Sequence, residues 1–267
     1  MSDFLSSLPL IWAGIAATDL ARYLIGALGV FLLINLALAG LLARRKIRPD
    51  SPPVKQMVTE FFVSLRTVFI FATAGGLLIA AGVAAGWIDL YMDPAKRGWL
   101  YFWASVVVLI VAHDAWFYWT HRLIHHPRLF RRVHRRHHRS NSPSPFTSYS
   151  FDVAEAVINA AFLPLIVLVI PVSPLAIFIF TSHMMLRNAV GHCGYELFPA
   201  WRGKPLFGWL TTVTHHDLHH AQAGWNFGLY FTFWDRVMGT EHPDYAERFA
   251  RAVRYVPVKE AGYQQPS

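Results

Sequence analysis

The chain has 267 residues, of which 54% are hydrophobic and 15% are charged, and its net charge is +8 with histidine neutral. Soluble domains carry about 25% charged residues, and a soluble chain this apolar would expose large hydrophobic patches and aggregate. The composition therefore excludes an ordinary soluble domain. The densest run of arginines, 128–139, lies just beyond an apolar helix, which is typical of a membrane-protein loop rather than of a nucleic-acid-binding surface.

The first hydrophobic stretches are expected to stay in the protein. The first three residues carry no positive charge, and no small-residue cleavage site follows the apolar stretch 8–18, so a signal peptide is not predicted. A helix needs about 20 apolar residues to cross a bilayer. Two uncharged stretches of that length, each bounded by charged residues, predict membrane spans at 23–43 and 67–88.

A third helix is predicted to begin near Gly98 and to leave the membrane. It is uncharged through Val111 and then becomes amphipathic, and no glycine or proline interrupts it before Pro127. His121 and His125 lie in the amphipathic part, which we expect to continue beyond the bilayer.

The fourth apolar region, 156–186, is long for a single span, and Pro171 and Pro174 divide it. Each half is short for a full crossing. We predict two half-deep helices joined by a proline turn, which enter and leave the membrane on one side. The alternative is a single kinked span, which would place the C-terminal part on the other side of the membrane.

Loop charges predict which side of the membrane each end of the bundle faces. Basic residues outnumber acidic ones by six to two in 44–66 and by seven to three in 113–155, whereas 89–97 has no basic excess. Both basic regions are therefore expected on the cytoplasmic side. The predicted fold is an all-α membrane bundle of three spans plus the hairpin, with a cytoplasmic histidine-rich helical cap. It forms a single domain, 1–267, with its catalytic region at 113–240.

Ten of the fourteen histidines lie in two short windows, 121–138 and 215–220. The first window contains H-x-x-x-H and then H-x-x-H-H, and the second contains H-D-L-H-H. Residues three or four positions apart share one face of a helix, whereas adjacent residues diverge by about 100°. The pattern therefore suits two metal ions side by side, and neutral imidazole binds iron, zinc, copper or nickel. Because Cys193 is the only cysteine, a thiolate cluster is excluded.

The metal interpretation competes with simpler ones. A lone histidine is usually a surface or core residue, as expected for His113, His126, His183 and His242, and the run 134–139 alone is compatible with a solvated basic loop. The H-E-x-x-H motif of zinc proteases and the Glu-x-x-His pairs of soluble di-iron bundles are absent from the sequence. A site made almost wholly of histidine at a membrane surface favours redox iron that activates dioxygen over hydrolysis.

Three motifs in order carry a family resemblance. They are F-Y-W-T-H-R-x-x-H at 117–125, L-F-R-R-x-H-x-x-H-H at 129–138 and H-H-D-L-H-H-A at 215–221, followed by N-F-G-L-Y at 226–230 and W-D-R-V-M-G-T at 234–240. From about Trp116 to Thr240 the chain resembles the fatty acid hydroxylase/sterol desaturase superfamily of membrane oxygenases. The resemblance implies a non-haem di-iron centre that uses dioxygen and two electrons to hydroxylate or desaturate a fatty acyl, sphingoid or sterol lipid.

The resemblance also implies which residues bind the irons. The implied ligands are His121, His125, His134, His137, His138, His192, His216, His219 and His220. Of these, His192 matches a histidine that many members carry between the second and third motifs. Some members have another histidine four residues earlier, where this chain has Asn188. The resemblance leaves three alternatives for the Asn188 side chain: it binds a metal through its amide oxygen, it holds a water, or it lies behind the ligands. The resemblance also leaves undecided whether His215 contacts a metal.

A histidine that binds a metal usually has its other ring nitrogen held by an acceptor. Asp217, inside the third motif, is the expected acceptor, and Asp114, Asp235 and Glu196 are further candidates. The aromatic run 116–119 is expected to line a lipid entrance between the third helix and the hairpin, or to belong to the interfacial aromatic belt. The arginines of the first window are expected to meet phospholipid headgroups.

No dinucleotide-binding, haem or iron–sulfur motif is present in the sequence, so we expect a separate electron-transfer protein. Purified protein with zinc in place of iron is compatible with these ligands. The alternatives are a carotenoid hydroxylase of the same chemistry, a non-oxidative histidine-rich metal-binding membrane protein and a hydrolytic di-zinc enzyme. The motifs do not separate hydroxylation from desaturation.

Overall fold

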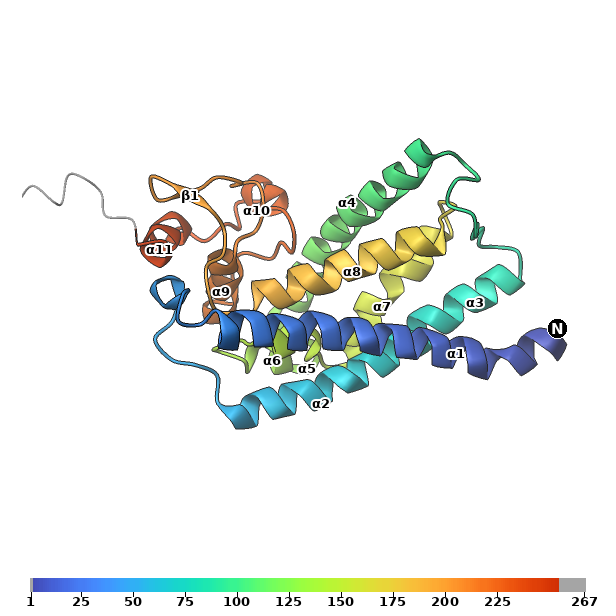
Figure 1. Cartoon of the computed structure of the whole chain (residues 1–267), viewed down its shortest axis with the longest axis horizontal. Coiled ribbons are helices and arrows are strands. Elements are labelled where there is room, and N and C mark those ends of the chain that lie inside the picture. Colours follow the sequence, from blue (N-terminus) through green and yellow to red (C-terminus); the bar gives the residue numbers. More distant parts are fainter. Residues whose placement is uncertain (1, 255–267) are drawn as a thin grey trace, which may run out of the picture.

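The computed structural model describes residues 2–254, and nearly all of its regular structure is helical. Long helices run side by side, and short helices gather at the end opposite the N-terminus (Figure 1). Within residues 2–254, three helical segments are long and apolar enough to cross a membrane, namely Ser6–Ala37, Val54–Ala84 and Trp99–Ile124. The chain is therefore an integral membrane protein built as an all-α bundle, as its sequence predicts.

The first two spans are continuous helices made of several segments. The first consists of α1 (Ser2–Tyr23) and the π-helical segments η1 (Leu24–Leu28) and η2 (Phe31–Ala37). The second consists of α2 (Val54–Ile70), the π-helical η4 (Phe71–Gly76) and α3 (Leu77–Ala84). A short 3-10 helix, η3 (Ala43–Arg45), lies in the connection between them.

Both spans begin well before their predicted starts. Charged residues mark the predicted starts, but the charged groups within these helices have partners in the bundle. Asp19 pairs with Arg22 one turn along the same helix, and the Glu60 carboxylate accepts hydrogen bonds from the hydroxyls of Ser140 and Ser144. Because paired polar groups are tolerated inside a membrane helix, they do not end it.

The third span, α4 (Trp99–Ile124), confirms the predicted long helix. Gly98 precedes it with a φ of 81°, in the left-handed region that glycine adopts without strain. Pro127 begins the next helix, α5 (Pro127–Val133). The last turn of α4 carries the first histidines to the end of the bundle.

The divided apolar region forms two helices, α7 (Val153–Val167) and α8 (Pro174–Gly191), which confirms the proline-split hairpin. Its depth in the membrane stays a prediction. At the tip the N–H of Val172 donates to the carbonyl of Asp89, and the N–H of Tyr91 donates to the carbonyl of Val172. With 15 and 18 residues, the helices are about 22 and 27 Å long, so they extend to the loop that joins the second and third spans.

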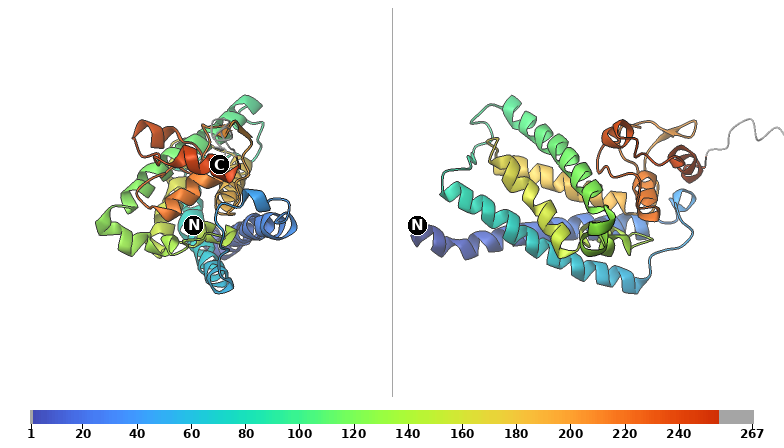
Figure 2. Two further views of the ribbon diagram at one scale, coloured as in Figure 1. Left: turned by 90° about the vertical axis from the view of Figure 1, so that its left-hand side faces the viewer. Right: turned by 180° about the vertical axis from the view of Figure 1, so that it is seen from behind.

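The remaining short elements form a cap over the other end of the bundle (Figures 1 and 2). Between α4 and α7 lie α5, α6 (Arg135–His138) and the 3-10 helix η5 (Pro145–Tyr149). After α8 come β1 (Ala200–Trp201), β2 (Lys204–Pro205), α9 (Val213–Ala221), α10 (Phe233–Val237) and α11 (Tyr245–Ala252). The two strands form a small antiparallel pair.

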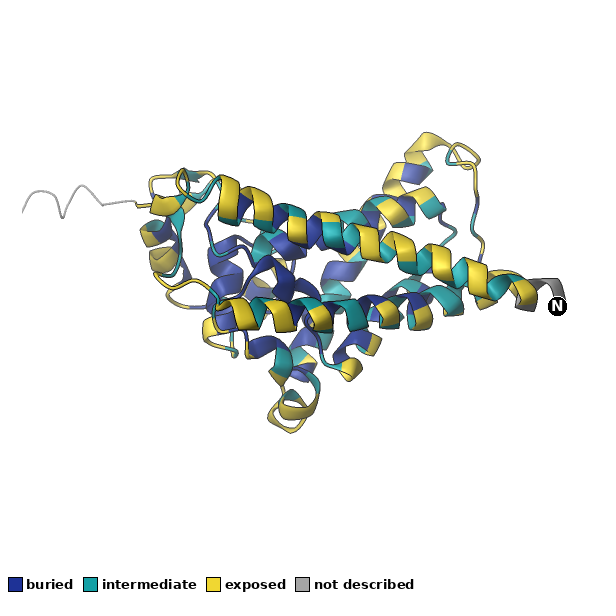
Figure 3. Ribbon diagram, turned by 60° about the horizontal axis from the view of Figure 1, so that its bottom comes forward, coloured by how far each residue is buried: buried dark blue, intermediate teal, exposed yellow. Residues whose placement is uncertain are grey.

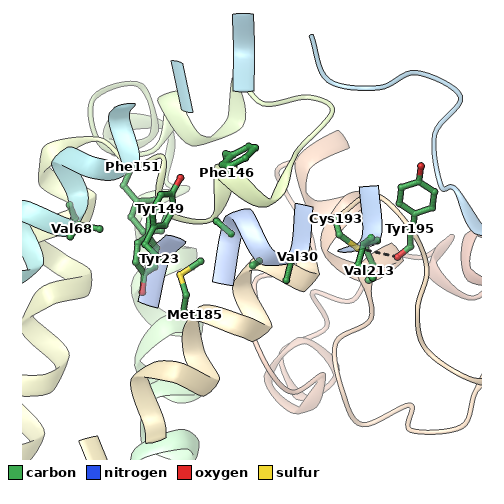
Figure 4. Packing of buried hydrophobic residues seen from close by; sticks show 14 residues of the cluster. Tyr23, Val30, Val68, Phe146, Tyr149, Phe151, Met185, Cys193, Tyr195 and Val213 are labelled. Atoms are coloured by element: carbon green, nitrogen blue, oxygen red, sulfur yellow. Dashed lines mark hydrogen bonds between the residues drawn. The ribbon is translucent and has the colours of Figure 1, made fainter. Parts of the chain in front are cut away.

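The main apolar core lies where the first two spans meet α8 and η5 (Figure 4). Tyr23 stacks on Tyr149 with ring centroids 5.8 Å apart. Met185 packs against Gly26 so closely that a Cβ atom added to Gly26 would lie 2.7 Å from the Cγ of Met185. Exposed residues instead follow the outward faces of the long helices (Figure 3). They include large apolar side chains such as Leu33. Such faces suit the hydrocarbon interior of a bilayer.

Candidate metal centre

Nine histidines come together at the capped end of the bundle, in two groups. Within each group the candidate ligand atoms all lie within 4.8 Å of one another. The members of group 1 are His121, His125, His134, His138 and His219. The members of group 2 are His137, His192, His216 and His220. The structure thus brings together all nine histidines that the sequence predicts as ligands.

Helical geometry distributes adjacent histidines between the two groups. In α6, His137 belongs to group 2 and His138 to group 1. In α9, His220 belongs to group 2 and His219 to group 1. Because adjacent residues of a helix point about 100° apart, each of these helices reaches both groups. His192, the C-cap of α8, completes group 2 from the hairpin.

Backbone carbonyls hold several rings through their Nδ1 atoms. The Nδ1 of His121 lies 2.9 Å from the carbonyl oxygen of Phe227, and the Nδ1 of His192 lies 2.7 Å from the carbonyl oxygen of Asn188. A carbonyl oxygen only accepts hydrogen bonds, so Nδ1 carries the proton in these neutral rings. Their Nε2 atoms therefore present lone pairs toward the interior of the groups.

The Nε2 atoms of each group face one another at short distances. His121 Nε2 lies 3.0 Å from His134 Nε2, while His192 Nε2 lies 3.0 Å from His216 Nε2 and 3.1 Å from His220 Nε2. Two nitrogen ligands about 2.1 Å from one metal ion, and at right angles to each other, lie about 3.0 Å apart. The nitrogen spacing in both groups therefore fits a shared metal ion.

His219 fits the same interpretation. Its Nδ1 lies 2.7 Å from the carbonyl oxygen of Trp225, and its Nε2 is buried without a hydrogen-bond partner among residues 2–254. Buried polar atoms nearly always have a partner in folded proteins. A cation bound by group 1 would satisfy this nitrogen.

The four histidines of group 2 and His219 are held in the uncharged form by burial. Burial lowers the pKa of His192 and of His219 to about 4. Burial, reinforced by neighbouring imidazoles, lowers the pKa of His137, His216 and His220 well below the ordinary value of 6.5. Since metals bind the neutral imidazole, these rings can take up a metal ion without first releasing protons.

Glu155 of α7 also reaches a ring, although the sequence motifs do not point to it. Its Oε1 lies 2.7 Å from the Nδ1 of His134, and both side chains are almost fully buried. The available signal was an acidic residue in the first turn of an apolar helix, which more often serves the helix dipole. The carboxyl group is placed to orient His134, and burial raises its pKa well above the ordinary value.

The two residues predicted to support the ligands have other partners than expected. The Asp217 carboxylate accepts hydrogen bonds from Arg48 Nε at 2.8 and 3.0 Å, instead of holding a ring. Its position in α9, one residue after a group 2 histidine, turns it about 100° from that face. Asn188 contacts His192 through its backbone carbonyl, while its side-chain amide donates to the carbonyl of Ser148.

The other acidic candidates hold backbone segments of the cap. Asp235 accepts a hydrogen bond from the N–H of Phe227, and burial raises its pKa to about 6. Asp114 binds N–H groups of the segment after α9, and Glu196 binds N–H groups before and at the start of α9. His215 belongs to neither group, and its Nε2 lies 3.7 Å from the carboxylate of Asp235.

A cavity of about 750 Å³ leads between the helices toward the histidines. Its walls come from all three spans and from both hairpin helices, and they are mainly apolar. Phe117 and Phe151 line its inner end. The Phe117 ring lies 4.8 Å from that of His121, and the Phe151 ring lies 5.4 Å from that of His137. A lipid in this cavity would therefore end beside both groups.

The four aromatic residues 116–119 lie in three different environments. Phe117 lines the cavity, whereas Trp116 and Trp119 line a separate groove between α4 and α7. The hydroxyl of Tyr118 is hydrogen-bonded to that of Thr240 in the cap. The run thus serves the cavity wall, the outer surface and the junction with the cap.

The family model described as fatty acid hydroxylase matches residues 106–240, a segment that contains all nine histidines. The chain belongs to the fatty acid hydroxylase/sterol desaturase superfamily. Among this member's curated relatives is the cholesterol 25-hydroxylase of Mus musculus, 31% identical over 207 residues that cover 75% of this chain and 66% of the relative. The lathosterol oxidase of Mus musculus is 28% identical over 193 residues, covering 68% of this chain and 58% of that protein.

Relatives of this superfamily member differ in the reactions that their names describe. The very-long-chain aldehyde decarbonylase GL1-7 of Oryza sativa subsp. japonica is 32% identical over 147 residues, which cover 52% of this chain and 23% of that protein. The chain thus spans less than two thirds of the length of each of these relatives. No solved structure matches it significantly. Membership of the superfamily therefore indicates the type of site, whereas it does not specify which reaction the site catalyses.

Proposed function

We propose that this superfamily member is a membrane-bound oxidoreductase that hydroxylates or desaturates a lipid. The observation that carries the proposal is the arrangement of nine histidines in two groups at the inner end of an apolar cavity. Imidazole ligands suit a redox metal such as iron, and the cavity suits an apolar substrate. The hydroxylase and oxidase names of two relatives agree with this reaction class.

Two iron ions would be held, one by each histidine group. Group 1 offers five nitrogen ligands and group 2 offers four, with the Glu155 carboxylate beside group 1. When bound, iron would supply the chemistry that activates dioxygen. A separate electron-transfer protein would provide the two electrons that this chemistry consumes. Zinc binds the same kind of nitrogen ligand, so the metal that the protein carries has to be measured.

The protein's own residues position the lipid and exclude water. The apolar walls of the cavity accept a hydrocarbon chain, and Phe117 and Phe151 guide it to the edge of the histidine groups. Exclusion of water around the reacting carbon limits side reactions. Rings mounted on α4 and α9, and held by backbone carbonyls, keep their directions while the lipid binds.

The histidine end of the bundle is assigned to the cytoplasmic side. Arg131, Arg135 and Arg139 are exposed on the cap that covers this end. Basic residues beside membrane spans are enriched on the cytoplasmic side. Anionic headgroups and the electron-transfer protein would meet this surface.

Comparative lipidomics tests the proposed reaction. A host without this chain would be compared with hosts that produce the wild type, His137→Ala or His126→Ala. His126 is the matched control, because it is exposed and belongs to neither group. A lipid that gains one oxygen or loses two hydrogens is expected with the wild type and His126→Ala, and it should disappear with His137→Ala.

Metal analysis of the same purified proteins separates the competing explanations. About two irons per chain, together with the lipid change, would support the oxidoreductase. Retained metal without any lipid change, when an electron donor is supplied, would favour a non-oxidative metal-binding protein. Zinc together with a hydrolysed lipid would favour a di-zinc hydrolase.

A further inference from the structure

Two charged residues lie inside the apolar cavity, at a distance from the histidines. Asp19 and Arg22 belong to the first span, and both line the cavity. Arg22 Nη1 donates a hydrogen bond to Asp19 Oδ1, and the two side chains are only 12% and 18% exposed. Charged groups within a membrane span are unfavourable, and those that occur usually face a functional cavity.

Arg22 is only partly satisfied by this ion pair. Its guanidinium lies over the ring of Phe178, 5.5 Å from the centroid. Its Nε is buried and has no hydrogen-bond partner among the residues that the structure describes. A buried charged donor without an acceptor is unfavourable. One place on the cavity wall therefore combines an unsatisfied donor with a neighbouring carboxylate acceptor.

The position of the pair along the cavity sets its distance from the metal centre. At about 1.5 Å per residue, the helix rise separates Phe178, which Arg22 contacts, from His192 of group 2 by roughly 21 Å. The cavity follows α8 over most of this length, from Pro174 at the hairpin tip to Asn188 beside group 2. A lipid with its polar end at the pair would present a part far from that end to the histidines.

We propose that Asp19 and Arg22 bind the hydroxyl group of a lipid alcohol and thereby select which part of the molecule reaches the histidines. A hydroxyl donates and accepts hydrogen bonds, so it matches the Asp19 acceptor and the Arg22 donor together. A free carboxylate only accepts hydrogen bonds, so it would match Arg22 but would leave its charge facing the Asp19 carboxylate, and a hydrocarbon would leave both groups unmatched. The site of oxidation rests on the proposed function, whereas the preference for an alcohol does not.

Equilibrium binding to the full chain, without an electron donor, tests this preference. The probes are 1-hexadecanol, hexadecanoate and hexadecane, which share one chain length and differ in the end group. The wild type should bind the alcohol about tenfold more tightly than the other two, as expected for a hydrogen bond to a charged group. Arg22→Gln should remove most of this preference while the affinity for hexadecane stays unchanged.

A second variant guards against a folding defect from an unpaired aspartate. Asp19→Leu/Arg22→Met replaces both charges by apolar groups of similar size, which proteins often tolerate, and it should also abolish the preference. Arg97→Gln is the matched control, because Arg97 pairs with Asp89 and neither residue lines the cavity.

The outcomes separate the binding site from the reaction. Equal wild-type affinity for alcohol and hydrocarbon, or tighter binding of the carboxylate, would overturn the hydroxyl site. A preference that survives in the double variant would overturn it too. An intact preference in a protein that oxidises no lipid would refute the proposed function and leave the hydroxyl site standing.

Discussion

Replacing Glu155 by glutamine tests whether the two histidine groups are separate metal sites. Glu155 Oε1 lies 2.7 Å from the Nδ1 of His134, which belongs to group 1. Glutamine keeps the size of the side chain but replaces the carboxyl group by an amide, which is a weaker acceptor for the Nδ1 of His134. Removal of such a partner lowers metal affinity by about 10- to 100-fold. Group 1 should weaken by that factor, whereas group 2 should keep its affinity.

Anaerobic titration of the metal-free protein with iron(II) measures this difference. In Glu155→Gln, one equivalent should bind with wild-type affinity and the other about 10- to 100-fold more weakly. Asp217→Asn makes the same chemical change in a carboxylate that binds Arg48, so it should leave both affinities unchanged. Equal weakening of both equivalents in Glu155→Gln, or no weakening of either, would refute the assignment of this carboxylate to one of two sites.

Three other properties of the protein can be checked directly. Arg48→Ala leaves a buried carboxylate of α9 unpaired, so thermal denaturation should show a loss of about 1–3 kcal/mol; an unchanged melting temperature would contradict this. In metal-free protein, stability should fall as the pH drops from about 6.5 toward 4. The folded pKa of His192 and His219 is about 4, so the unfolded chain binds more protons in that window; a flat series of melts against pH would count against neutral buried rings. In a cysteine-free background, Ser51→Cys should react with an impermeant maleimide from the cytoplasm and Ala95→Cys from the opposite side; labelling of both from one side would exclude the three-span topology.

The histidine groups could be predicted from the sequence because the relevant geometry is local. The spacing within one short helix already sends His137 and His138 in different directions, and the structure places them in different groups. The third span was predictable for a similar reason, since an uninterrupted run leads to Pro127. Where neighbours in the chain decide the outcome, the sequence is sufficient.

Features that depend on tertiary partners were not predictable in this way. Asp19 and Arg22 look like the boundary of a span, but they pair with each other inside the bundle. Glu155 meets His134 only because the start of α7 packs beside the short helices of the cap. The tip of the hairpin is held by backbone pairing of Val172 with the loop between two spans. The i,i+3 spacing of Asp19 and Arg22 marks their pairing but not their place inside the bundle, and neither periodicity nor spacing marks the partners of Glu155 and Val172.

The cap and the metal centre depend on each other for stability. α5 has seven residues and α6 only four, and helices this short are unstable on their own, yet α6 and its N-cap supply His134, His137 and His138. One side of α6 is tied to the start of α7, where Arg136 pairs with Asp152 at 3.0 Å. On the other side, its rings lie with candidate ligand nitrogens within 4.8 Å of those of other histidines, an arrangement that a bound cation stabilises. Metal binding therefore contributes directly to the free energy of folding of the cap. The long helices are instead stabilised by apolar packing.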